Sequence, residues 1–202
     1  MKTTILIFGI LAYGQVTAQC SFKGPGKGSS FSNNISIGSY AWANPSNARE
    51  SDDLYAASNI QISSFTETST YYLVATDFGF AIPANASICG IEIQLEKHYQ
   101  VNSGSLSSIT DKSVRIVIKG TPEGDDKAAG EAWLSGDEQS YYGGISDKWG
   151  LSLTTTDINS STFGVAISAS VSSGFSDLDL DALIDQITIT VYYNSLLPVN
   201  FK

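Results

Sequence analysis

The residue types that carry most enzyme chemistry are scarce in this chain. His98 is the only histidine, and an alternating run places it on one polar strand face with Glu92 and Glu96. Pairing with Glu96 would make it a general base or a metal ligand, since histidine titrates at about pH 6.5. The polar face itself favours a simpler interpretation, an exposed surface histidine. No nucleophile elbow, His-Glu-x-x-His motif or phosphate loop occurs, so we expect the protein not to be an enzyme.

Carboxylates are the next candidates. Two of them could hydrolyse a glycoside, but among 20 acidic residues a suitably spaced pair arises by chance, so a glycoside hydrolase is the least favoured function. Asp52 and Asp53 lie in an expected loop whose carbonyl oxygens could join them around a structural calcium ion. The alternating aspartates at 177, 179 and 181 would share a strand face, where mutual repulsion also favours a cation. The alternative is that all these acids form a solvated surface.

Aromatic residues provide the sharpest binding hypothesis. Flat rings offer a large contact area at low entropic cost and stack on the apolar faces of sugars. One glycine-rich segment, residues 120–150, has no obvious strand pattern and contains four such rings: Trp133, Tyr141, Tyr142 and Trp149. Gln139 and Asp147 could bind sugar hydroxyls beside them. The alternative is that the rings pack this long segment onto the body of the protein.

The N-terminus and the cysteines indicate export. Lys2, the apolar run 5–12 and the small residues before Gln19 match a secretory signal, which predicts cleavage after Ala18. The run is too short to span a bilayer, and we expect no transmembrane segment in the mature chain. Cys20 and Cys89 would then meet oxidising conditions, and we expect a disulfide between them rather than two free thiols. The predicted location is therefore secreted, extracellular or at the cell surface.

Composition narrows the class of partner. Charged residues make up 15% of the chain and the net charge is −9 with only 11 Lys+Arg. Nucleic-acid binding needs clustered cations, so we expect none. Aromatic residues at 11% and regular apolar runs can support a folded core, which excludes a disordered chain.

Period-two alternation indicates the fold. Apolar residues alternate with their neighbours along four segments, residues 91–96, 114–119, 163–168 and 187–192, as half-buried strands require. Residues 59–63 and 71–76 are two more strand candidates, and Thr, Val, Ile and Tyr dominate these segments as a whole. The best helix candidate, residues 178–185, alternates as a strand would. With no sequence for crossover helices, an all-β, antiparallel, jelly-roll-like sandwich is predicted over residues 19–194, followed by a tail or linker at 195–202.

Several motifs resemble a family of secreted β-sandwich modules found in type IX secretion-type surface proteins. They are Trp42-x-Asn44-Pro45-x-Asn47-Ala48, Ser51-Asp52-Asp53, Tyr142-Gly143-Gly144, Trp149-Gly150, Asp157-Ile158-Asn159-Ser160 and Phe163-Gly164-Val165. The tail Leu197-Pro198-Val199-Asn200-Phe201 is similar to the junction that precedes a further domain in type IX secretion substrates. This resemblance implies fold and setting but no particular activity. The tail implies either that the chain is a piece of a longer surface protein or that it departs from the family's pattern, and the alternative is an ordinary tail after the final strand.

Two functions follow as expectations. The first is a non-catalytic surface module for adhesion or extracellular assembly, in contact with surface proteins or with copies of itself. The alternative is a carbohydrate-binding module that uses the four rings, with a structural calcium ion as its one cofactor.

Overall fold

Two strands of more than 30 residues organise the molecule. The computed structural model describes residues 20–195, and the predicted signal peptide and the tail beyond Ser195 lie outside the described residues. The elements are β1 (Ser21–Lys27), β2 (Ser30–Asn34), η1 (Pro45–Arg49), β3 (Ala56–Ile62), β4 (Glu67–Ser69), β5 (Tyr72–Thr76), β6 (Ala86–Ile118), β7 (Thr121–Glu123), β8 (Glu138–Gly143), α1 (Thr155–Ile158) and β9 (Gly164–Ser195). The described residues are therefore nearly all strand and loop, which confirms the predicted all-β class.

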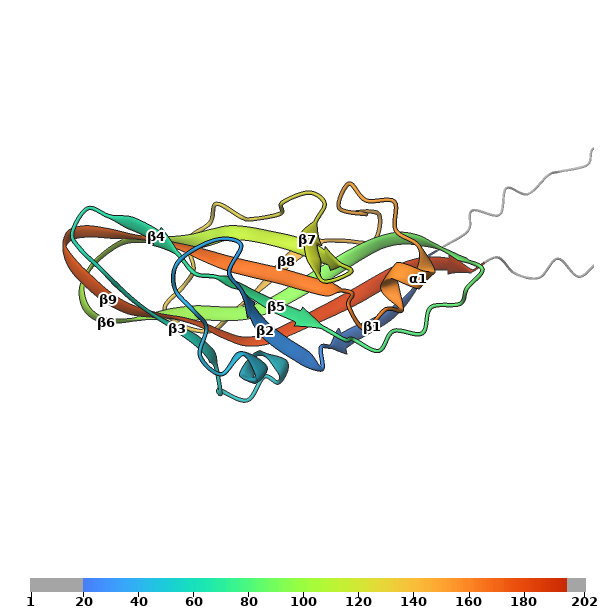
Figure 1. Cartoon of the computed structure of the whole chain (residues 1–202), viewed down its shortest axis with the longest axis horizontal. Helices are drawn as coiled ribbons and strands as arrows, with labels where there is room; N and C mark the ends of the chain where they lie inside the picture. The colour runs from blue at the N-terminus through green and yellow to red at the C-terminus, as the bar shows by residue number, and fades with distance from the viewer. Residues whose placement is uncertain (1–19, 196–202) are drawn as a thin grey trace, which may run out of the picture.

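The strands β6 and β9 pair antiparallel from Ala86↔Ser195 to Val117↔Gly164, and this ribbon folds back on itself. Figure 1 shows both strands curving around the left end of the molecule. The pairing is interrupted there, between Gly104↔Leu178 and Leu106↔Ser173. Gly104 has a φ of +94°, and a Cβ at this position would lie 1.8 Å from the carbonyl oxygen of Asp177, so only glycine fits the turn. We call this region the bend end.

The folded ribbon builds two layers. The centre of the first layer is the C-terminal half of β9 paired with the N-terminal half of β6. β1 and β3 pair with the free edge of this half of β9, and β8 pairs with the free edge of this half of β6. In the second layer the order is β2-β5-β9-β6-β7, and β4 also pairs with β9. A long hairpin folded into two facing sheets is the plan of a jelly roll, as predicted.

The core lies between the layers and follows the predicted alternation. Ile91, Ile93 and Leu95 of β6 are fully buried, as are Ile187 and Ile189 on β9. Residues 178–185 belong to β9, which confirms their strand-like pattern. What the periodicity did not predict is that the runs at 91–96 and 114–119 belong to one continuous strand, β6, and those at 163–168 and 187–192 to another, β9.

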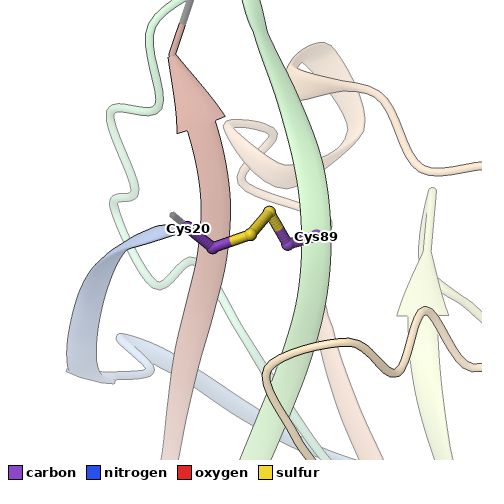
Figure 2. Close-up of a disulfide and its surroundings, with 2 residues drawn as sticks. All are labelled: Cys20 and Cys89. Atoms are coloured by element: carbon purple, nitrogen blue, oxygen red, sulfur yellow. A yellow bond between two sulfur atoms is a disulfide. The ribbon is translucent and has the colours of Figure 1, made fainter. Parts of the chain in front are cut away.

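The expected disulfide is present at the end opposite the bend. Cys20 and Cys89 are bonded, with their Cα atoms 6.5 Å apart. Figure 2 shows the bond crossing from the start of β1 to β6, and these two strands flank the C-terminal half of β9. Ser195 pairs with Ala86 at this same end. We call it the stapled end.

The segment 120–150 differs from the expectation of a long loop without strands. It contains β7 and β8, which pair with opposite ends of β6. β8 was missed because it is polar and only Tyr142 of its six residues is buried. Among residues 20–195 there is no helix long and apolar enough to cross a membrane.

Candidate functional site

Three of the four rings predicted to bind sugar are buried. Trp133, Tyr142 and Trp149 have exposed fractions of 2%, 5% and 0%. Trp149 donates its indole N–H to the carbonyl oxygen of Ile91, 3.0 Å away. These rings cannot stack on a ligand, so the prediction of a four-ring binding surface is wrong, and the alternative of core packing holds for these three. Tyr141 alone is exposed, and its hydroxyl donates to the side chain of Gln139.

The buried rings surround an ion pair that the sequence reading missed. Nζ of Lys97 lies 2.6 Å from Oδ1 of Asp111, and the two side chains are 3% and 0% exposed. Trp133 donates its indole N–H to Asp111, and the Tyr142 hydroxyl contacts both charged groups. Lys97 lies on the N-terminal half of β6 and Asp111 on the C-terminal half, so the pair joins the two layers through the core.

A signal for this ion pair exists in the sequence. Lys97 continues the inward series Ile91, Ile93, Leu95 by parity, and Asp111 follows Ile109 in the same way. A charged residue on an apolar strand face needs a buried partner, because an unpaired buried charge is costly. Burial, followed by the charge of Asp111, raises the pKa of the Tyr142 phenol, so this hydroxyl keeps its proton.

His98 lies on the outer face of the first layer and is held by neighbours. Its Nδ1 lies 2.6 Å from a carboxylate oxygen of Asp137, while Tyr55 donates its hydroxyl to the other oxygen at 3.1 Å. The Tyr55 ring packs edge-on against the imidazole, 4.8 Å between centroids. The partner of His98 is therefore Asp137, not Glu96, and the histidine is only partly exposed.

Asp52 and Asp53, the predicted calcium ligands, take part in local hydrogen bonds of the backbone. The N–H groups of Asp52 and Asp53 both donate to the buried carboxylate of Asp185, and Asp52 accepts from the backbone of Leu54. Within residues 20–195 no group of three His, Cys, Asp or Glu side chains is placed to hold a metal ion. A calcium site at Asp52 and Asp53 stays a prediction.

The alternating aspartates meet amides instead of a cation. Asn59 donates to both Asp179 and Asp181 at 3.0 Å, and Asn102 donates to the same two carboxylates at 3.1 and 3.0 Å. Gln61 donates to the second oxygen of Asp179. Hydrogen bonds from Asn102, Asn59 and Gln61 lower the pKa of Asp179, so it stays ionised.

A hollow opens beside these carboxylates at the bend end. Its volume is about 370 Å³, and its lining comes from the end of β3, from Ser103 of β6 and from the start of the C-terminal half of β9. The polar lining residues are Gln61, Ser63, Ser103, Asp177 and Asp179. Except for amide contacts to Asp179 and a backbone N–H donated to Asp177, these groups face an open space large enough for a small ligand.

Two exposed phenylalanines lie near this hollow, each two residues along the chain from a lining residue, Ser63 or Asp177. Phe65 and Phe175 are 79% and 81% exposed, the two highest values among the large hydrophobic residues of the described chain. The backbone N–H of Phe65 donates to the carbonyl of Gly174, which places the β3–β4 loop beside the turn in β9. Ser64 next to Phe65 donates its N–H to the lining residue Asp177. Sequence reasoning missed both rings, although each stands in a serine-rich stretch without apolar neighbours at i±2.

No protein-family model and no curated protein matches this chain. Among solved structures it is similar to one described as "CBM4 structure and function", with 14% identity over 69% of this chain and 85% of that one and a TM-score of 0.36. It is also similar to "Structure of infectious bursal disease virus Gx strain", with 13% identity, 73% and 38% coverage and a TM-score of 0.25. Both TM-scores are below 0.5, so the fold assignment rests on the strand topology of this chain itself.

Proposed function

We propose that this chain is a non-catalytic, exported binding module whose bend end binds a carbohydrate. The observation that carries the proposal is the exposure of Phe65 and Phe175 at the same end of the molecule as the polar hollow of about 370 Å³, each two residues along the chain from a residue that lines it. The disulfide fits an oxidising compartment, in keeping with the predicted export.

The chemistry of this end suits a sugar ring. A pyranose has apolar faces that stack on flat aromatic rings and hydroxyls that need hydrogen-bond partners at their edge. Phe65 and Phe175 supply the rings. Asp177 and Asp179 accept hydroxyl protons, while Ser63, Ser103 and Gln61 both donate and accept.

The negative charge of the bend end determines which classes of sugar can bind there. Asp177, Asp179 and Asp181 give this end a negative potential, and the whole chain carries −9. Like charges in an interface are costly, so uronic-acid and sulfated polysaccharides are disfavoured. Neutral glycans and those with free amino groups are the expected ligands.

Adhesion through protein contacts is the second candidate. The exposure of Phe65 and Phe175 favours it, because apolar side chains exposed together at one end are typical of a protein interaction site. In this case the same rings would insert into a partner protein or into a second copy of the chain.

The deciding experiment is a glycan-array screen of the purified chain at neutral pH, with Phe175→Ala and Phe22→Ala as a matched pair. Phe22 is also an exposed phenylalanine, 64% exposed, but it lies on β1 near the stapled end. We expect binding to neutral or amino glycans that falls at least about tenfold in Phe175→Ala and stays unchanged in Phe22→Ala. Equal loss in both variants, or binding only to anionic glycans, would contradict the proposed site. Failure to bind any glycan, together with self-association that Phe175→Ala abolishes, would support protein contacts instead.

A further inference from the structure

Lys97 and Asp111 meet in the core in an arrangement suited to covalent chemistry. Nζ of Lys97 lies 2.6 Å from Oδ1 of Asp111, and neither side chain is more than 3% exposed. We propose that these two side chains condense to an intramolecular isopeptide bond between Nζ of Lys97 and Cγ of Asp111. The inference is independent of the ligand assigned to the bend end.

Burial and proximity both favour condensation. Each ion of a buried pair carries a desolvation penalty, which a neutral amide does not incur. Two groups fixed in contact react as if at an effective concentration of about 10⁵–10⁸ M. Closure of the core around the pair also keeps out the bulk water that would reverse the reaction.

The neighbours of Asp111 activate its carboxyl group for attack. The indole N–H of Trp133 donates to Oδ1 at 2.8 Å, and the backbone N–H of Ala129 donates to Oδ2 at 3.1 Å. When the lysine nitrogen attacks Cγ, negative charge develops on these oxygens. Fixed donors that already point at them stabilise that charge, as in an oxyanion hole.

Tyr142 completes the proton path. Its hydroxyl lies 2.6 Å from Nζ of Lys97 and 2.8 Å from Oδ2 of Asp111. The ammonium first passes one proton to the carboxylate, which gives an amine and a carboxylic acid. That proton lies on Oδ1, the oxygen that Nζ contacts. The nitrogen then bonds to Cγ, and Tyr142 takes a proton from the nitrogen and gives its own to Oδ2. The Cγ–Oδ2 bond breaks as the Oδ1 proton moves to the departing oxygen, so that Oδ2 leaves as water and Oδ1 becomes the amide carbonyl.

The step balances without a cofactor. One ammonium and one carboxylate become one amide and one water molecule, with no change of oxidation state. A hollow of about 270 Å³, lined by Lys97 and Tyr142 among others, borders the pair and can receive the released water molecule. The bond would close a covalent ring through residues 97–111, which include the bend of β6.

A tryptic digest of the purified, reduced chain tests the bond directly. Trypsin cuts after Arg49, Lys97 and Lys112, but not after an acylated lysine. We expect residues 50–112 as one peptide, lighter than its sequence by one water, with fragmentation that links positions 97 and 111. Free peptides 50–97 and 98–112 at their sequence masses would overturn the proposal. A lost water with Lys97 still cleaved would mean cyclisation of Asp111 alone, and would also overturn it.

The Tyr142→Phe variant tests whether the Tyr142 hydroxyl is needed for the bond, as distinct from the packing of its ring in the core. This variant keeps the ring in the core and removes only the hydroxyl that carries the proton. We expect a folded chain that yields free peptide 98–112. Intact linkage in this variant would exclude Tyr142 as the proton carrier. Lys97→Arg serves as the matched control, because it retains the charge but should lack the link.

Discussion

The two ends of the sandwich use the same residue type in opposite ways. Away from the bend, Phe80 and Phe163 pack at 6.1 Å between centroids, and both are buried. At the bend end, Phe65 and Phe175 lie almost fully in solvent beside a polar hollow. We therefore expect substitutions at the stapled end to change the free energy of unfolding, and substitutions at the bend end to change ligand binding.

The largest effect is expected when a buried ring near the stapled end is removed. Trp149→Ala leaves a cavity in the core and removes one of the two N–H groups that donate to the carbonyl of Ile91, the other being the backbone N–H of Gly144, which should lower the free energy of unfolding by about 3–5 kcal/mol. Chemical denaturation followed by fluorescence measures this change. A folded Trp149→Ala variant of unchanged stability that loses glycan binding would reverse the assignment of this ring to the core.

The second-largest effect on stability is expected when the Cys20–Cys89 disulfide is removed. Cys20→Ser with Cys89→Ser opens a loop with a sequence separation of 69 residues, which should cost about 4 kcal/mol because the unfolded chain gains freedom. The same fall in unfolding free energy is expected when reductant is added to the wild type. Under conditions where this variant is still folded, glycan binding at the distant bend end should be unchanged. A parallel loss of binding would show that the two ends are coupled.

Phe65→Ala and Phe175→Ala should have little effect on stability. Neither ring is buried, so each change should alter the unfolding free energy by less than about 0.5 kcal/mol. Denaturation midpoints within error of wild type, combined with lost binding, would sharpen the contrast with Trp149. A fall of more than about 2 kcal/mol would mean that the rings pack in solution and are not free to bind.

Sequence patterns predicted the buried strands well, and the site poorly. Alternation marks which residues face inward, so the core of β6 and β9 and the all-β class could be read from it. The aromatic residues were misjudged because a glycine-rich segment suggests an open loop. Gly143 instead brings the chain close to Trp149, whose Nε1 would lie 2.6 Å from a Cβ at that position. Phe65 and Phe175 come together only through the fold of the ribbon at the bend, a long-range pairing that local periodicity does not encode.

A small, pH-dependent effect on stability is expected on the outer face of the first layer. Burial, followed by the charges of Glu96 and Asp137, raises the pKa of Asp185, although the N–H groups of Asp52 and Asp53 oppose the rise. A carboxyl group whose pKa is raised by folding destabilises the folded state only when ionised. The penalty is therefore absent below the ordinary Asp pKa of about 3.9 and present once the pH exceeds the raised value.

Glu96→Gln removes one of the charges that oppose ionisation of Asp185. We expect this variant to be more stable than wild type by about 0.5 kcal/mol at pH 7, because Glu96 is partly solvent-screened, with the gain vanishing below about pH 4. Glu92→Gln, on the same face of β6, makes the same change in net charge without being among the charges that act on Asp185. Denaturation curves of both variants between pH 3 and 7 separate a specific effect from a general one. Equal gains in the two variants would mean that net charge alone, and not the Asp185 neighbourhood, sets the pH dependence of this face.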